Sequence, residues 1–167
     1  MQKFKELILM EYVKILLSAY PNLDKVIRTE GENYLRRCFN SAFFSEPCDK
    51  FSEKLLSLYA RREKLIVLKN KLDVLFSRLS DEEKAMLNFK YAGILPKTKF
   101  TFSTRTYFRR QIKLMKKVEE YLGFLNLTEE TFKKDYADIW FFKSLGQSVK
   151  EIARRRNDLA LKKIFSS

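Results

Sequence analysis

Helical periodicity is the feature of this sequence that most limits its fold. Glycine occurs four times and proline three times in 167 residues, and both lie mostly at the borders of segments whose apolar residues recur every three or four positions. Apolar residues at this spacing form one face of an α-helix. No segment shows a convincing period of two, which would indicate a strand. The sequence therefore predicts an all-α fold, a helical bundle with a long central helix.

Caps and breakers set the borders of the predicted helices. The expected helices cover 2–19, 23–43, 46–79, 81–92, 104–122, 129–146 and 149–165. Ser80 followed by Glu83 has the spacing of a capping box, and Gly93 suits the left-handed turn that ends a helix. The other side chains expected to cap helices are Ser45 with Pro47 in the first turn, Ser103, Thr128, and Ser148 paired with Glu151.

The helix over 46–79 is the longest. Its leucines recur at threes and fours between Phe51 and Leu79, interrupted by the polar residues 61–64. At 1.5 Å per residue, about 30 residues reach about 45 Å. Such a helix either forms the spine of the bundle or pairs with a second copy of the chain, so a homodimer is one expected assembly.

Three regions follow from these elements. An N-terminal helical region covers 1–79 and contains the long helix with its expected dimerisation surface. A helix-turn-helix region covers 80–124, and a C-terminal helical region covers 125–167.

Positive charge is the main functional signal. Lysine and arginine number 34 against 21 acidic residues, a net charge of +13. The excess is clustered in 97–118, in 148–163 and on the long helix. Eight basic residues with no Asp or Glu lie between Lys97 and Lys117. A clustered excess indicates a polyanionic partner, nucleic acid first, whereas an evenly basic surface would only keep the protein soluble.

Catalytic and metal chemistry are not expected. The chain has no histidine, so Ser-His-Asp and Cys-His arrangements are absent from the sequence. Two cysteines without histidine cannot fill a tetrahedral zinc site, and four scattered glycines do not make a phosphate-binding loop. Carboxylate chemistry with magnesium stays open, although no cluster of Asp and Glu suggests it. We therefore expect a protein that is not an enzyme, with no cofactor and no metal.

The sequence also indicates a cytoplasmic location. Cys38 and Cys48 have no repeating framework, which fits a reducing compartment. The N-terminal segment is interrupted by charges and lacks a small-residue cleavage site, and no run of about 18 apolar residues indicates a membrane span.

The Ser103-capped helix is the candidate site. We expect Phe108, Ile112, Met115 and Leu122 to face inward, with Tyr107, Leu114 and Val118 beside them. A helix of this kind fits the DNA major groove with its N-terminal end toward the bases. The candidate DNA contacts are Lys97, Lys99, Ser103, Thr104, Arg105, Arg109, Arg110 and Lys113, and additional phosphate contacts are expected from Arg154, Arg155 and Arg156.

Residues 79–122 resemble region four of bacterial sigma factors and the helix-turn-helix regulators of phages and mobile elements, such as the ArpU family. The matching stretches are "LSDEEKAMLNFKYAG" and "STRTYFRRQIKLMKKVEEYL". The resemblance implies a sequence-specific duplex DNA-binding transcription regulator, with RNA polymerase as a further partner. It assigns base or phosphate contacts to Thr104, Arg105, Arg109 and Arg110.

The chain departs from that family in its connector. Only "ILPKTKFTF" follows Gly93, where family members carry a scaffold helix. A second stretch, "LGQSVKEIARRRNDLA", contains the Gly-x-Ser-x-x-Glu-Ile-Ala pattern of a scaffold helix, but too few residues follow it for a recognition helix. We interpret it as a basic terminal helix that packs on the bundle.

Other functions stay open at this point. The chain could be a helical protein-interaction module, for example one that binds RNA polymerase, with an incidental basic face on a core helix. It could also bind RNA or single strands, because aromatic rings beside basic residues stack on unpaired bases. The rings concerned, which core packing would also explain, are those of Phe100, Phe102, Tyr107 and Phe108.

Overall fold

The computed structural model of the chain describes residues 11–40, 47–96, 100 and 102–149. These residues form helices joined by turns and loops, with no strand among them, which confirms the all-α helical bundle. No helix in the described ranges combines the length and apolarity needed to cross a membrane. The described residues divide into two compact units, one over Tyr20–Phe102 and one that joins the residues up to Ala19 with those from Ser103 onward.

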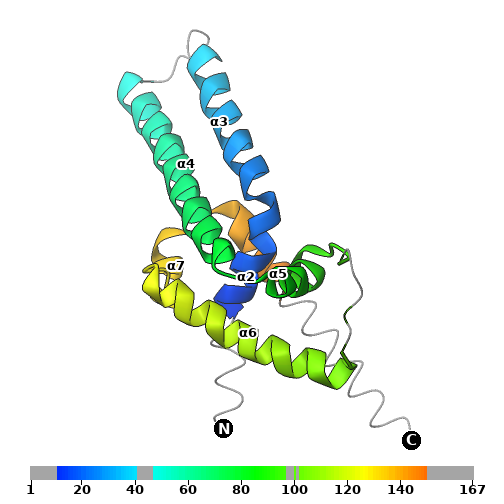
Figure 1. Cartoon of the computed structure of the whole chain (residues 1–167). Coiled ribbons are helices and arrows are strands. Elements are labelled where there is room, and N and C mark those ends of the chain that lie inside the picture. The colour runs from blue at the N-terminus through cyan, green and yellow to red at the C-terminus, as the bar shows by residue number, and fades with distance from the viewer. Residues whose placement is uncertain (1–10, 41–46, 97–99, 101, 150–167) are drawn as a thin grey trace, which may run out of the picture. The chain divides into compact units, whose positions relative to one another are not determined.

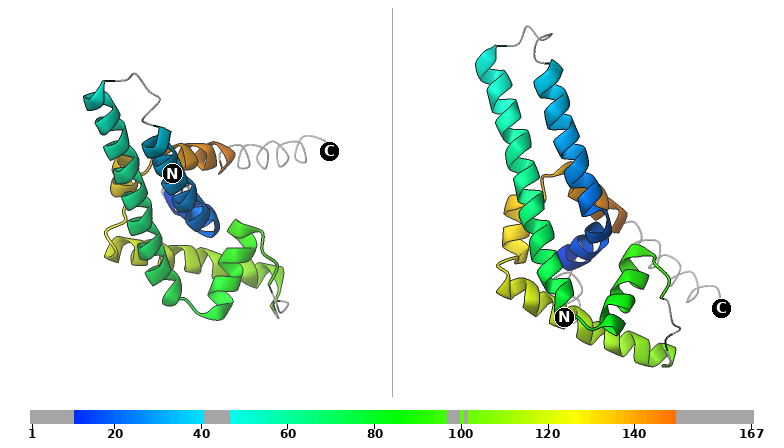
Figure 2. Two further views of the ribbon diagram at one scale, coloured as in Figure 1. Left: turned by 90° about the horizontal axis from the view of Figure 1, so that it is seen from above. Right: turned by 45° about the horizontal axis from the view of Figure 1, so that its top comes forward.

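A long helical hairpin dominates the unit over Tyr20–Phe102. The 3₁₀ turn η1 (Tyr20–Asn22) leads into α3 (Leu23–Asn40), which lies antiparallel beside α4 (Cys48–Ser77) in Figures 1 and 2. The predicted long helix is thus confirmed. Pro47 is its N-cap residue and not part of the first turn, so the expected position of Pro47 was wrong, and Ser45 lies outside the described residues. Proline suits a helix start because its missing N–H has no partner there.

The hairpin has a core at one end only. Four leucines of α4, spaced at threes and fours, are fully buried, and two apolar residues of α3 are buried as well. The set is Leu65, Leu68, Leu72 and Leu75 on α4, with Leu23 and Val26 on α3. None of the described residues in 31–40 and 48–64, which we call the arm, is buried. Burial of apolar area is the main driving force of packing, so the hairpin is held chiefly at its base.

A buried carboxylate marks the border between core and arm. Glu30 on α3 is only 2% exposed, and its Oε2 lies 3.9 Å from Arg61 Nη1 on α4. The next residue is Gly31, where an added Cβ would lie 3.1 Å from Arg62 Nε. Glycine therefore lets the Arg62 side chain approach the α3 backbone more closely than any other residue would.

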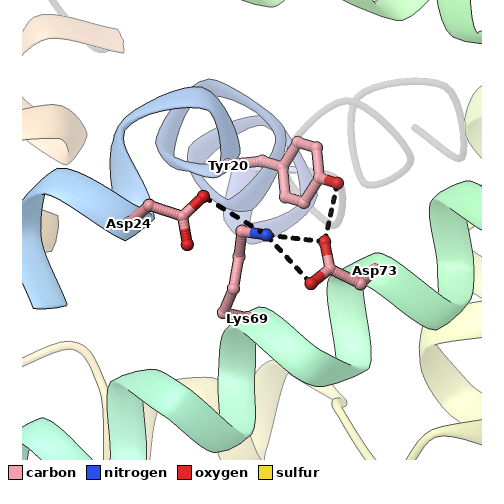
Figure 3. A network of polar contacts seen from close by, with 4 residues as sticks. All are labelled: Tyr20, Asp24, Lys69 and Asp73. Atoms are coloured by element: carbon pink, nitrogen blue, oxygen red, sulfur yellow. Dashed lines mark hydrogen bonds and ion pairs between the residues drawn. The ribbon is translucent and has the colours of Figure 1, made fainter.

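A polar network joins η1 and α3 to α4 at the base of the hairpin (Figure 3). Tyr20 Oη donates to Asp73 Oδ1 at 2.7 Å, and Lys69 Nζ donates to both Asp73 oxygens at 2.7 and 2.9 Å. Asp24 Oδ2 lies 3.4 Å from the same ammonium. The Tyr20 ring also stacks on Phe76 with ring centroids 4.0 Å apart. Charge-assisted bonds of this length are stronger than neutral ones, so the network fixes how the two helices meet.

The same unit continues into a short capped helix, α5 (Asp81–Leu87). Ser80 Oγ accepts from the Glu83 amide at 3.3 Å, and Glu83 Oε2 accepts from the Ser80 amide at 2.9 Å. The predicted capping box is therefore confirmed. A π-helical turn, η3 (Asn88–Ala92), follows, and Gly93 with φ of 68° ends it in the left-handed conformation, as predicted.

The other unit contains α2 (Glu11–Ala19), α6 (Thr104–Phe124), α7 (Glu129–Asp135) and a further helical stretch over 140–149. α2 contacts α6. Its core combines aliphatic side chains of α2 and α6 with a cluster of rings; its buried side chains include Val13, Leu16, Val118, Leu122, Leu127, Phe132, Tyr136 and Phe142. Ser103 and Thr128 cap α6 and α7 as predicted.

The predicted single helix over 129–146 is wrong, because turns at 136–139 break it. The break lets Phe132 and Phe142 meet edge to face with centroids 5.5 Å apart. In a continuous helix, residues ten apart are separated by about 15 Å along the axis. The predicted helix start at Ser148 is also wrong: Ser148 lies inside the helical stretch 140–149, and its hydroxyl donates to the Ser144 carbonyl at 3.1 Å. Glu151 lies outside the described residues.

The network around Asp73 makes stability depend on pH. Burial alone would raise the pKa of Asp73, but hydrogen bonds from Lys69 and Tyr20 outweigh burial and lower it. A carboxylate whose folded pKa is depressed adds stability above its unfolded pKa of about 3.9, and that stability is lost as pH falls through the folded pKa.

We therefore predict that Asp73→Asn lowers the free energy of unfolding by about 1–2 kcal/mol at pH 7. The difference from the unsubstituted chain should shrink as pH falls below the unfolded pKa of about 3.9 and through the lowered folded pKa of Asp73, because this carboxylate then becomes protonated. Urea unfolding followed by circular dichroism between pH 2.5 and 7 measures both. Asp24→Asn, which changes a mostly exposed carboxylate at a longer distance, is the matched control and should have a smaller effect. If Asp73→Asn lowers the free energy of unfolding by the same amount at every pH in this range, the lowered pKa of Asp73 is contradicted.

Candidate nucleic-acid interface

The start of α6 is built as a capped helix end. Ser103 Oγ accepts from the Thr106 amide at 3.4 Å and lies 3.1 Å from Thr106 Oγ1. This bond confirms the predicted cap. The first turn of any helix carries backbone N–H groups without helical partners, and these groups and the helix dipole favour anions.

The buried face of α6 differs from the predicted one. Five residues at helical spacing are buried: Gln111, Leu114, Met115, Val118 and Leu122. Met115 and Leu122 were expected there, and Leu114 and Val118 beside them. Phe108 and Ile112 were also expected inward, but their side chains are 57% and 61% exposed, so that prediction was wrong.

Gln111 explains the error. It lies three, four, seven and eleven residues before the apolar members of the buried face, and is itself only 3% exposed. A polar residue at the start of a buried face hides where that face begins. The apolar Phe108 and Ile112 then make a neighbouring face of the helix look like the buried one. No partner accepts a bond from Gln111 Nε2 among the described residues, so this amide is an unusual component of the core.

The opposite side of α6 combines basic and apolar residues. We define the outer face as Arg105, Phe108, Arg109, Ile112, Lys113 and Lys116, all exposed and separated by steps of three or four residues. Side chains at such steps are neighbours on one helix surface. Arg110 is exposed beside them. The outer face therefore presents four cations and two apolar side chains without a carboxylate.

The far end of α6 carries the opposite charge. Glu119 and Glu120 follow the outer face, and burial together with the carboxylates of Glu129 and Glu120 raises the pKa of Glu119. The same acidic surroundings act on Tyr12, where burial and then the carboxylates of Glu119 and Glu129 raise the pKa to about 12. A polyanion is repelled here, so contact with one is restricted to the N-terminal half of the helix.

The sequence-predicted site residues are brought together in part. Arg105, Arg109, Arg110 and Lys113 are exposed on α6, Ser103 caps it, and Thr104 is its first residue. The remaining ones, Lys97, Lys99, Arg154, Arg155 and Arg156, lie outside the described residues. Phe108 and Ile112 belong to the outer face, although the sequence pattern predicted that they face inward. The apolar series of Leu114, Val118 and Leu122 at steps of four was the signal that could have identified the buried side.

The connection before α6 is longer than a helix-turn-helix turn. Residues 93–102 separate the end of η3 at Ala92 from the Ser103 cap, whereas the turn of this motif usually has three or four residues. The described part of this connector contains no helix, so it holds no scaffold helix over 93–96 or at 100 and 102. α5 belongs to one compact unit and α6 to the other.

The aromatic rings near α6 are mostly engaged. Phe100 stacks with Phe102 at a centroid distance of 5.3 Å and meets Phe89 edge to face at 6.2 Å. Tyr107 is half-buried. Of the four rings considered for stacking on unpaired bases, Phe108 is the one with most of its side chain exposed.

Comparison with known proteins gives no match: no family model, curated protein or solved structure is similar to this chain. The resemblance of residues 79–122 to sigma region four therefore stays a prediction that rests on those residues.

The orientation of α6 can be tested by stability. Leu122→Ala should lower the free energy of unfolding by about 2–5 kcal/mol, because it empties a fully buried site. Phe108→Ala should lower it by at most about 1 kcal/mol, because more than half of that side chain is already in water. Chemical denaturation of both variants decides the matter. Equal and large losses would show that Phe108 packs inside.

Proposed function

We propose that the chain binds duplex DNA through the outer face of α6 and acts as a sequence-specific transcription regulator of the sigma region-four type. The observation that carries the proposal is the outer face itself, four exposed cations on one side of a capped helix with no acidic residue between 97 and 117. The major groove is about 12 Å wide and admits one helix. The ten-residue connector between η3 and α6 is a departure from the short turn of the motif that the proposal invokes.

Position along α6 suggests the role of each cation. Arg105 and Arg109 lie in the first turns, the part of a recognition helix that usually reaches base edges. Arginine bonds both acceptors of guanine in the major groove. Lys113 and Lys116 lie further along, where lysine contributes as a point charge toward phosphates. The acidic end at Glu119 and Glu120 lies beyond the groove in this arrangement.

Two competing functions make different predictions. A single-strand or RNA binder would need several exposed rings, and the engagement of Phe100 with Phe102 favours duplex DNA over that reading. A helical module that binds RNA polymerase would use the hairpin, and would form a complex that survives high salt. RNA polymerase as an additional partner of a DNA-bound regulator is compatible with our proposal.

Selection from a random duplex pool with the purified protein tests the class of function. We expect one enriched motif that contains guanine, and a weaker preference for it in Arg105→Ala. A pool without enrichment, or tighter binding to single strands than to duplex, would overturn sequence-specific duplex binding.

We predict that duplex binding depends strongly on salt. Each neutralised phosphate contributes about −0.9 to the slope of log affinity against log salt, so about five contacts lower affinity by two to three orders of magnitude between 50 and 200 mM. Lys113→Ala should reduce the slope by about one. Lys134→Ala, an exposed lysine on the acidic α7, is the matched control and should leave the slope unchanged. Fluorescence anisotropy measures the slope, and a value near zero would be incompatible with phosphate contacts.

We propose in addition that two copies of the chain pair along α4. Ala60, Val67 and Val74 recur every seven residues on the exposed side of α4, and exposed Leu56 lies four residues before the first of them. This is the spacing of a coiled-coil seam. Polar residues within the seam, Glu63 and Asn70, would fix its register at some cost in affinity. A dimer would also cover part of the arm.

Accordingly, light scattering at tens of micromolar should give the mass of a dimer. Val67→Glu should give a monomer, because it places a charge in the seam; Val67 is 47% exposed, so the monomer should still fold. Thr29→Glu introduces the same charge on exposed α3 surface and should leave the mass unchanged. A monomeric mass for the unsubstituted chain would exclude this pairing.

A further inference from the structure

Two large apolar side chains on a basic surface need an explanation that phosphate binding does not supply. Phe108 and Ile112 are 57% and 61% exposed, one helical turn apart, on the same outer face as Arg105 and Arg109. Phosphates and guanine edges are recognised by cations and hydrogen-bond donors. Apolar side chains at these two positions therefore point to an apolar group in the ligand.

Duplex DNA presents one such group in its major groove, the C5-methyl of thymine. We propose that Phe108 and Ile112 read thymine methyl groups, so that the outer face selects thymines beside the guanines contacted by its arginines. This inference rests on the proposed DNA-binding function and adds the chemical class of the target sequence.

The spacing of the two side chains defines the spacing of the thymines. Residues four apart on an α-helix are separated by about 6 Å along its axis. Stacked base pairs are about 3.4 Å apart, so two steps cover about 6.8 Å. A helix that follows the groove would therefore place Phe108 and Ile112 over methyl groups about two base pairs apart. Arg105 and Arg109 have the same separation and would contact bases with the same interval.

Another ligand combines negative charge with an apolar layer, namely the surface of an anionic membrane. A helix that lies in a membrane interface needs a broad apolar face. The broad apolar face of α6, from Leu114 to Leu122, is buried within its own unit, and the outer face has only two apolar residues among four cations. The observations therefore favour DNA, and vesicle binding becomes an outcome of the test.

The test uses the full chain and a duplex recovered by selection from a random pool, compared with the same duplex in which deoxyuridine replaces every thymidine. This replacement removes the methyl groups and keeps the hydrogen-bonding edges. Burial of one methyl is worth about fourfold in affinity, so two contacts should make the uridine duplex bind about fifteenfold more weakly. Phe108→Ala with Ile112→Ala should bind both duplexes equally.

Phe124→Ala is the matched control. Phe124 is 77% exposed on the same helix but lies at its acidic end, so this variant should keep the full preference for thymine. Thermal unfolding of every variant verifies that the substitutions act on binding and not on folding. Vesicles that contain anionic lipid form a separate arm of the experiment.

The outcomes separate the inference from the function on which it rests. Saturable duplex binding with equal affinity for thymine and uridine duplexes, or selection without thymine enrichment, overturns the inference and leaves DNA binding in place. Absence of saturable duplex binding overturns both. Vesicle binding that requires Phe108, with no thymine preference, assigns the two side chains to a membrane and also overturns the inference.

Discussion

Burial of one row of leucines on α4 is the constraint on which the hairpin unit depends. The row from Leu65 to Leu75 is buried on α4, which packs against α3. The polar network of Tyr20, Lys69 and Asp73 lies at the same end of the hairpin. Towards the arm, Glu30 ends the core. Stability within a protein follows local burial, so amides in the arm should exchange with solvent at lower opening free energies than those at the base. The base of the hairpin should therefore open at a higher free energy than the arm.

In the unit that contains α6, burial of apolar side chains likewise fixes the structure, because one side of this helix packs in the core and the other faces solvent. Val118 and Leu122 hold one side in the core, which leaves the other side free to carry cations and two apolar groups. The helix is thus oriented by its packing and not by its charges. A surface whose direction is fixed by a packed core can present several side chains in register, which is what recognition of an ordered ligand requires.

The sequence predicted the fold class and most local signals well, and the reasons are physical. A capping box such as Ser80 with Glu83, or a left-handed glycine such as Gly93, depends on only a few neighbouring residues, so the local pattern is sufficient. The break at 136–139 accompanies the contact between the Phe132 and Phe142 rings, which no local pattern contains. The face of α6 was misassigned because Gln111 is buried against its usual preference. For the candidate site, the sequence located the basic cluster but not the outward position of Phe108 and Ile112.

The separation of charge along α6 would affect how this part of the molecule is oriented as it approaches a polyanion. Cations from Arg105 to Lys116 precede the carboxylates from Glu119 to Glu130, so positive charge in this part of the molecule lies toward the start of the helix and negative charge toward its end. In the field of a polyanion such a separation of charge experiences a torque as well as an attraction. In the DNA complex that we propose, this torque would turn the unit that contains α6 so that the Ser103 end of the helix faces the DNA, and a larger share of collisions would have a productive orientation.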